Sequence, residues 1–274
     1  MIISKNLDHK LTTSLIGYEN YFSFFKKLIQ NNNLPEVLMF TGEKGIGKAT
    51  FVNHCMHYLF DSKNYNEKSL TIDEKSFFHS QLANSLFPNI YTLDGLSLED
   101  NKIEKIRELK EFLSKSSLNQ GKRYIILDNV ETFNVNCLNA LLKILETPSN
   151  NNHFVLINNK TLPLIETIKS RCLDIKIHFN DENRNEIISK LLNKNDVKII
   201  FDKNIVSVTP GNFLIFNYLF NKKKLDLNEN LLFNIKKILN LYKKNKNIIF
   251  KDLIFFLTQY YLKKKKIDNK YSSQ

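Results

Sequence analysis

Hydrophobic and polar residues follow two different periods along the first 180 positions. Ile103, Ile106, Leu109 and Leu113 recur at three- and four-residue steps with charged residues between them, which is typical of an amphipathic helix. A second stretch with this period contains Leu138, Leu141, Leu142 and Leu145. Short continuous apolar runs lie between such stretches and predict buried strands. The expected strands are Val37–Thr41, Ile90–Leu93, Arg123–Leu127, Phe154–Ile157 and Leu173–Ile177.

Strands that alternate with helices predict an α/β fold, a doubly wound parallel sheet with helices on both faces. After Asn180 the strand-like runs stop. Helices are expected there over Asp181–Leu192, over a shorter segment after it, and over Gly211–Phe220, Leu231–Tyr242 and Lys251–Leu262. The polar stretch Ser62–Lys75 is expected to be a loop, and the charged tail from Lys263 to fray. We therefore expect an α/β domain over residues 1–178, a small helical domain over 179–221 and a short basic helical segment over 222–274.

The segment after the first expected strand is rich in glycine. Residues 42–50 read GEKGIGKAT, close to the pattern G-x-x-x-x-G-K-[ST] of a phosphate-binding loop. Gly42, Gly45 and Gly47 can turn backbone N–H groups inward as an anion nest, and Lys48 can reach the β- and γ-phosphates from the start of a helix. The loop therefore predicts a site for ATP or ADP.

One residue of the loop departs from that pattern. Ala49 stands where the magnesium-binding hydroxyl is expected. Thr50 comes one residue late, and one residue turns a helical side chain by roughly 100°. The loop therefore argues against a well-bound Mg²⁺ ion.

A second candidate position follows the buried run Tyr124–Leu127. Asp128 matches the strand-end carboxylate that faces the phosphates and holds magnesium in P-loop NTPases. The glutamate that would polarise the attacking water normally comes next, but here the residue is Asn129, whose amide cannot accept a proton. Glu131 lies outside the pattern and is expected to begin the following loop or helix.

Composition narrows the class of protein. The three cysteines, Cys55, Cys137 and Cys172, form no C-x-x-C pair, which argues for a reducing cytoplasm and against a disulfide framework or a zinc site. The first ten residues do not have the form of a signal peptide, and the apolar run Leu253–Leu262 is too short to span a bilayer.

The net charge of +12 is concentrated towards the C-terminal end. Residues 222–274 contain 14 lysines and four acidic residues, a net charge of +10. Such a segment favours nucleic acid or an acidic partner. The whole chain is also rich in Lys, Asn and Ile, a bias that explains part of the excess, so contact of this segment with DNA stays an open alternative.

Three further stretches form a recognisable set: residues 139–148 (NALLKILETP), residues 154–158 (FVLIN) and Ser170-Arg171-Cys172. Together they resemble the bacterial DNA polymerase clamp-loader family of AAA+ proteins. The pair Leu34-Pro35 and residues 103–109 fit the same family. The resemblance covers roughly residues 14–220 and implies an AAA+ domain, a helical lid and a C-terminal helical collar.

The resemblance also implies roles for single residues. Arg171 resembles the arginine finger that one subunit projects into the ATP site of its neighbour, where a guanidinium stabilises charge on the transferring phosphoryl group. Asn158 resembles the residue that senses the γ-phosphate. The lid arginine of the family, expected shortly after Gly211, is replaced by Asn212.

Two further departures concern whole segments. Many members of the family have a cysteine-rich zinc module after the first helix, but Tyr58–Leu93 contains no cysteine. About fifty residues follow Lys222, so the implied collar is short.

The losses at Ala49, Asn129 and Asn212, together with a retained Arg171, resemble the delta-prime or stator branch of the family. The resemblance implies a subunit that no longer hydrolyses ATP but serves its neighbour during loading of the sliding clamp. The implied partners are the other subunits of a hetero-pentamer, the clamp and primed DNA, with no membrane. Two alternatives stay open: an active ATPase motor of the same family, and a small P-loop kinase, which would leave Asn139–Pro148 unexplained.

Overall fold

The computed structural model describes residues 7–96, 102–114, 121–146, 151–195 and 197–271. These residues belong to two compact units, one that ends at Phe179 and one that begins at Asn180. The expected further boundary near residue 221 stays a prediction.

The first unit is built around a parallel sheet. Its strands lie in the order β4 (Ile90–Asp94), β5 (Arg123–Asp128), β6 (Asn152–Asn158), β1 (Val37–Thr41) and β7 (Leu173–Lys176), and every neighbouring pair is parallel. The five strands lie within two residues of the expected bounds. The prediction of an α/β fold with a parallel sheet is confirmed. Because all strands point the same way, their carboxyl ends form one edge, where open sheets of this class bind ligands.

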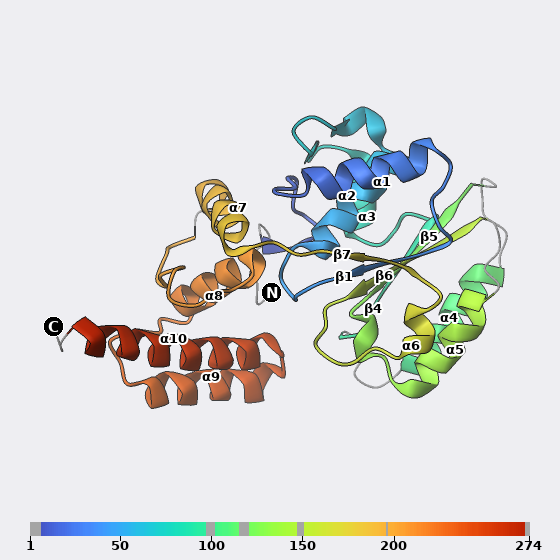
Figure 1. Cartoon of the computed structure of the whole chain (residues 1–274). Helices are drawn as coiled ribbons and strands as arrows, with labels where there is room; N and C mark the ends of the chain where they lie inside the picture. The colour runs from blue at the N-terminus through green and yellow to red at the C-terminus, as the bar shows by residue number, and fades with distance from the viewer. Residues whose placement is uncertain (1–6, 97–101, 115–120, 147–150, 196, 272–274) are drawn as a thin grey trace. The chain divides into compact units, whose positions relative to one another are not determined.

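Helices cover both faces of the sheet (Figure 1). The helices α1 (Glu19–Gln30), α2 (Lys48–Phe60) and α3 (Phe77–Ala83) lie on one side. On the other side are α4 (Lys102–Ser114), α5 (Val135–Glu146) and the short α6 (Glu166–Lys169).

Alternate residues of β1, an interior strand of the sheet, face the two helical layers. Val37 and Met39 are buried in the core that α4, α5 and α6 complete, together with Ile106, Leu109, Cys137 and Leu141. Phe40 points the other way, and its ring meets that of Phe51 on α2 edge-on at 5.1 Å. Every residue of β1 is buried, as expected for a strand covered on both faces.

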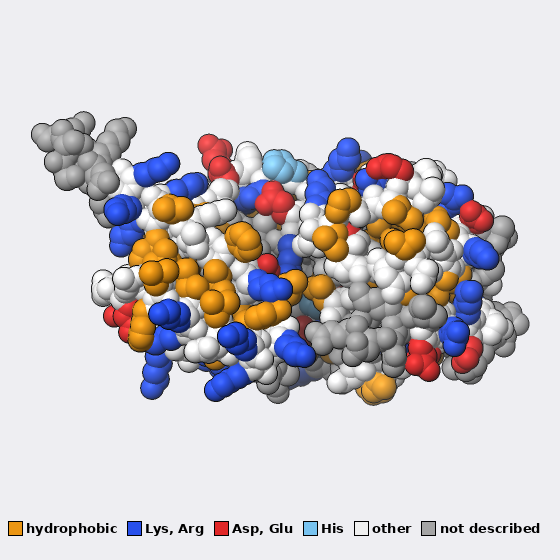
Figure 2. Space-filling model, turned by 90° about the horizontal axis from the view of Figure 1, so that it is seen from below, with side chains coloured by type: hydrophobic (Ala, Val, Ile, Leu, Met, Phe, Trp, Pro, Cys, Tyr) orange, Lys and Arg blue, Asp and Glu red, His pale blue; other side chains and the backbone are white. Residues whose placement is uncertain are grey.

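The second unit is helical in its described part. It contains α7 (Asp181–Lys194), α8 (Pro210–Lys222), α9 (Leu231–Asn245) and α10 (Ile249–Tyr271). Phe201 is fully buried at its centre, with ring centroids of Phe220 and Phe256 at 4.9 Å and Tyr260 at 5.2 Å. Large apolar side chains of α9 and α10 remain exposed: Leu232, Phe233, Leu239, Phe255 and Leu262. Figure 2 shows hydrophobic side chains among lysines over this part of the unit.

Three local predictions were wrong. The described residues between α7 and α8 form no helix, because side chains satisfy the backbone there: the Asn217 Oδ1 accepts from the N–H groups of Ile200 (2.6 Å) and Phe201 (3.1 Å). The expected loop Ser62–Lys75 contains a 3₁₀ turn, η2 (Ser62–Asn64), and a two-stranded hairpin of β2 (Tyr65–Asn66) and β3 (Thr71–Ile72). The charged tail from Lys263 continues α10 to Tyr271.

Candidate functional site

The glycine-rich loop joins β1 to α2 at the carboxyl edge of the sheet. Gly42 follows β1 directly, and a Cβ atom there would lie 2.6 Å from the carbonyl oxygen of Ile177, so only glycine fits. Gly45 and Gly47 have φ values of 81° and 110°, and Gly47 is the N-cap of α2. The first N–H groups of α2 have no acceptor within the helix and point from its positive end. The loop thus has the backbone form of a phosphate cradle.

Lys48, the first residue of α2, is turned into this loop. Its side chain is buried, and Nζ donates to the carbonyl oxygens of Gly42 and Glu43, both at 2.8 Å. Burial lowers the pKa of Lys48 to about 8, although the carboxylates of Asp128 and Glu131 act in the opposite direction. The ammonium group therefore bonds to the carbonyl groups of its own loop, at the place from which it would reach a phosphate.

Ala49 and Thr50 lie in the first turn of α2. The methyl group of Ala49 has no atom that can bind a metal ion, and the structure gives no contact that makes Thr50 a substitute. The cradle fits a phosphate, but this turn does not fit the magnesium ion that would accompany it. Among the described residues, no group of three or more His, Cys, Asp or Glu side chains could hold a metal ion.

The end of β5 contains a network of four polar side chains. Asn129 follows Asp128 and has a left-handed backbone, with φ of 52°. Its amide nitrogen donates to Oδ1 of Asp94 at 2.8 Å, and its amide oxygen accepts from Asn159 Nδ2 at 2.8 Å. Asn159 also donates to Asp128 Oδ1 at 3.3 Å. Asn129 therefore connects the ends of β4, β5 and β6.

Asp128 is largely removed from solvent at this edge. Burial, followed by the neighbouring carboxylate of Asp94, raises its pKa. The backbone N–H of Asn129, which donates to Asp128 Oδ1 at 2.7 Å, and the amide of Asn159 oppose this shift. Asp94 and Asp128 are direct partners in the register of β4 and β5, and this explains why the first carboxylate affects the second.

From the sequence, Glu131 is expected to begin the following loop or helix and has no assigned role at the site. The residue belongs to a 3₁₀ turn, η3 (Val130–Thr132), and is buried with only 3% of its surface exposed. Its Oε1 accepts from the hydroxyl of Thr161 at 2.7 Å, whereas Oε2 has no hydrogen-bond partner among the described residues. Nothing in the sequence identifies Glu131 as a site residue, because a glutamate two residues after Asn129 fits no motif. Only the fold places its carboxylate where it acts on Lys48.

Asn158 and Asn159 have different roles at the end of β6. Asn158 is buried; its carbonyl oxygen accepts from the N–H of Gly42 at 3.1 Å, and its side-chain Oδ1 accepts from the N–H of Lys160 at 3.0 Å. Asn158, the predicted phosphate sensor, thus borders the loop and orders the turn that follows it. Asn159, which was not predicted, makes the contacts with Asp128 and Asn129.

Arg171 lies far from all of these residues. It follows α6 and precedes β7, whose residue Leu173 pairs with Leu38 near the start of β1. Ile177 lies beside Gly42, and the extended segment from Leu173 to Ile177 spans roughly 13 Å. Arg171 lies in the turn before Leu173, so its backbone is at least that far from the level of the loop. The Arg171 side chain is too short to cover that distance. The structure therefore separates Arg171 from the other predicted site residues, at the opposite edge of the sheet.

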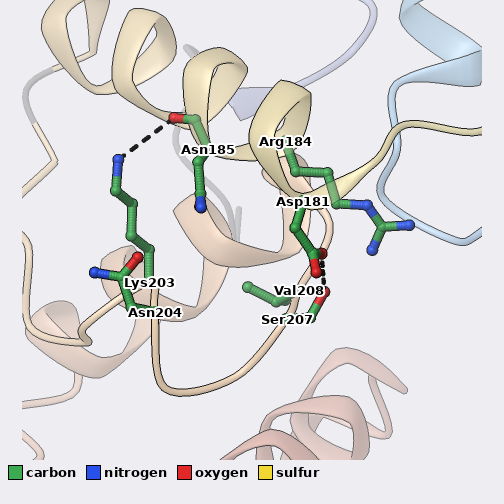
Figure 3. Close-up of a pocket in the computed structure, with 7 residues that line it drawn as sticks. All are labelled: Asp181, Arg184, Asn185, Lys203, Asn204, Ser207 and Val208. Carbon is green, nitrogen blue, oxygen red and sulfur yellow. Dashed lines mark hydrogen bonds between the residues drawn. The ribbon is translucent and has the colours of Figure 1, made fainter.

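A small cavity of about 140 Å³ lies within the second unit. Figure 3 shows its lining residues, which come from α7 and the segment before α8. Ser207 donates to Asp181 Oδ1 at 2.7 Å, and Lys203 donates to Ser189 Oγ at 2.9 Å and to the carbonyl of Asn185 at 3.5 Å. Polar groups that satisfy one another in this way provide packing within the unit. Asn212, which replaces the lid arginine of the family, lies in the first turn of α8.

The parallel sheet, the glycine-rich loop after β1 and the strand-end Asp128 define an α/β domain of the AAA+ P-loop NTPase class. A family model described as "DNA polymerase III, delta subunit" matches residues 17–181, more than half of the chain. The chain therefore belongs to this clamp-loader family. Membership also argues against the small P-loop kinase.

Individual relatives agree with this assignment. The delta-prime subunit of DNA polymerase III from Pseudomonas aeruginosa is 34% identical over 93 residues, which are 34% of this chain and 28% of that protein. The delta-prime subunit from Bacillus subtilis is 29% identical over 146 residues, 53% of this chain and 42% of that protein. The chain thus spans less than half the length of either curated relative.

A solved structure is similar over a longer part of the chain. The gamma subunit-related protein of DNA polymerase III from Thermotoga maritima is 14% identical, with 86% of this chain and 90% of that one covered and a TM-score of 0.42. That score is too low to support an argument, so the fold assignment stands on the strand order. In the described part of the chain, no helix is both long and apolar enough to cross a membrane.

Proposed function

We propose that this chain is a non-hydrolysing, stator-like delta-prime subunit of a DNA polymerase III clamp loader. The observation that supports this most directly is the position of Asn129. Both ends of its amide are bonded, to Asp94 and to Asn159, and the residue occupies the place that a general base would need. An amide cannot accept the proton of an attacking water. The loss of the metal hydroxyl at Ala49 acts in the same direction.

Arg171 supports a role in trans. An arginine that lies a strand length, roughly 13 Å or more, from the chain's own loop can act on a phosphate only if a neighbouring subunit presents one. A guanidinium stabilises the charge that develops on a transferring phosphoryl group. We therefore assign to Arg171 the role of an arginine finger for the ATP site of an adjacent subunit.

The chain's own loop serves a different purpose in this proposal. Gly45, Gly47 and Lys48 can hold the phosphates of ATP or ADP, which would supply negative charge to the positive end of α2. Lys48 would then exchange its bonds to the carbonyls of Gly42 and Glu43 for bonds to phosphate oxygens. Without a metal hydroxyl or a base, such a nucleotide would stabilise the fold and would not be turned over.

The partners in this proposal are the other clamp-loader subunits, the sliding clamp and primed DNA reached through the assembled complex. The exposed apolar and lysine-rich surface of α9 and α10 is the part of the second unit suited to a collar contact between subunits.

Two measurements test the proposal. The purified chain, given saturating ATP and Mg²⁺, should hydrolyse ATP no faster than its Lys48→Ala variant, and a clear Lys48-dependent turnover would contradict the loss of catalysis. In the complex reconstituted with the partner subunits, Arg171→Ala should lower ATP hydrolysis, because the finger serves a neighbour. Lys169→Ala is the matched control, since it removes an exposed cation two residues away.

One observation favours the active motor as a second candidate. Glu131 provides a buried carboxylate whose Oε2 has no hydrogen-bond partner among the described residues and which acts on Lys48. A carboxylate in this place could replace the missing base. If this chain is an active motor, the isolated wild-type chain should hydrolyse ATP and the Glu131→Gln variant should not. If it is a stator, neither the wild type nor the variant should hydrolyse ATP.

A further inference from the structure

The guanidinium of Arg171 is fixed by two groups from its own subunit. NH2 donates to Oε1 of Glu146 at 2.7 Å, and NH1 donates to the carbonyl oxygen of Thr167 at 2.8 Å. Glu146 is the last residue of α5, and Thr167 lies in α6, so two helices hold one side chain. About one third of the Arg171 side chain remains exposed.

The geometry leaves part of the guanidinium for another molecule. An arginine has five N–H donors in a planar fork, and the contacts with Glu146 and Thr167 engage one donor on each terminal nitrogen. Holding one side of the plane fixes the direction of the other side. A long side chain that is free in solution would otherwise lose rotamer freedom when it met its target.

Stability alone does not explain this contact. The side chains of Glu146 and Arg171 are half and one third exposed, and ion pairs with such exposure add little to the stability of the fold. A second ion pair in the same segment can be compared with this one. Lys169 and Glu166 also lie 2.7 Å apart, and the side chain of Glu166 is almost fully exposed. The two pairs differ in that one includes the arginine assigned to the neighbour's site.

We propose that Glu146 is a positioning residue, which orients Arg171 for the ATP site of the adjacent subunit. This inference rests on the proposed function of Arg171. Glu146 does not touch the nucleotide; it holds the guanidinium before the subunits meet and stays bonded to it afterwards. Preorganised charge of this kind acts on the transition state more than on ground-state binding, because the cost of orientation is met in advance.

The test uses the reconstituted clamp loader with primed DNA, the sliding clamp and ATP. Four variants of this chain are compared with the wild type: Glu146→Gln, Arg171→Ala, the double variant, and Glu166→Gln as the matched control. The part of the turnover that depends on Arg171 is the difference between wild type and Arg171→Ala. We expect Glu146→Gln to lower that part of kcat about ten-fold, with the KM for ATP changed less than about two-fold. The double variant should be no slower than Arg171→Ala, and Glu166→Gln should match the wild type.

The outcomes separate the two proposals. If Arg171→Ala lowers the turnover but Glu146→Gln does not, the positioning role is wrong and the finger stands. If Arg171→Ala has no effect, the finger itself is wrong. Thermal unfolding of each isolated variant identifies a loss of folding, and additive losses in the double variant would show that Glu146 acts independently of Arg171, which contradicts the inference.

Discussion

The side-chain nitrogen of Asn129 donates to Oδ1 of Asp94 at 2.8 Å, and this bond joins the ends of two neighbouring strands. The partner is a carboxylate, so the residue at position 129 must be a donor. A glutamate there would set two carboxylates against each other beside a third, that of Asp128, whose pKa is already raised by burial and by Asp94. The environment of Asn129 is thus adapted to an amide.

This relationship predicts the effect of restoring the family's glutamate. Asn129→Glu should lower the free energy of unfolding by about 2 kcal/mol and should not produce ATP hydrolysis, because the new carboxylate lacks a donor and faces like charge. Asn129→Gln is the matched control, since it has the same length without the charge. Denaturant unfolding at pH 7 measures both. Equal stability of the two variants would show that charge is not the cause.

A second prediction concerns Gly95, which follows β4. A Cβ atom there would lie 2.3 Å from Oγ1 of Thr132 and 2.6 Å from the carbonyl oxygen of Asn129. Because the second contact is with backbone, it cannot be relieved by a side-chain rotation. Gly95→Ala should therefore destabilise the chain by about 1–3 kcal/mol, measured by thermal or denaturant unfolding. An unchanged melting temperature would show that the segment at Gly95 and the segment Asn129–Thr132 can move apart at little cost.

Two arginines of the first unit, Arg123 and Arg171, should respond differently to removal. Arg123 is buried; its guanidinium donates to Asn152 Oδ1 and to the carbonyl oxygens of Phe112 and Leu113 at 2.8–3.0 Å. Arg123→Gln should cost about 2–4 kcal/mol of stability, because it removes hydrogen bonds of a charged donor to one buried and two part-buried acceptors. Arg171→Ala should cost under about 1 kcal/mol. Chemical denaturation of both variants measures the contrast, and a large loss in Arg171→Ala would mean that this arginine also supports the fold.

Acid should destabilise the chain through two buried histidines. His57 and His79 face each other, with Nε2 and Nδ1 separated by 3.4 Å. Burial, and then the charge of His79, lowers the pKa of His57 to about 4, and burial also lowers that of His79. The unfolded chain, with an ordinary histidine pKa near 6.5, binds protons that the folded chain excludes. Stability should therefore fall as the pH drops from about 6.5 towards 4.

Unfolding curves of the wild type and of His57→Gln at pH 7 and pH 4.5 measure this effect. We expect the wild type to lose about 2 kcal/mol more than the variant over this range. His178→Gln is the matched control, because His178 is exposed. If His57→Gln and His178→Gln keep the same pH dependence as the wild type, the histidine pair is not the source of the acid sensitivity.

Much of the fold follows from local patterns. Val37–Thr41 was predicted with its observed bounds, and the apolar periods identified over Ile103–Leu113 and Leu138–Leu145 lie within α4 and α5. These segments could be predicted because burial of one or both faces of a helix or strand determines where its apolar residues occur in the sequence. Where side chains from distant helices satisfy the backbone, prediction failed, as in the segment before α8, whose N–H groups at Ile200 and Phe201 donate to Asn217.

The candidate site shows the same division. The loop of Gly42–Lys48 could be recognised because its residues are consecutive and each has a backbone reason. Asp94, Asn159 and Glu131 could not, because no motif connects them and each lies on a different segment. They meet Asp128 and Lys48 only because parallel strands end at one edge of the sheet.

By itself, the sequence determined the α/β class, the phosphate loop with its missing hydroxyl, and the retained Arg171, because these depend on residue type and local spacing. The tertiary structure decided how Asn129 is bonded, which residue faces Lys48, and that Arg171 lies at the edge opposite the loop. The physical reason is the parallel sheet. Its strands all run in one direction, so residues that follow different strands meet at one edge although they are distant in sequence. Arg171 precedes β7, whereas Gly42 follows the neighbouring strand β1, so the two residues lie a full strand length apart.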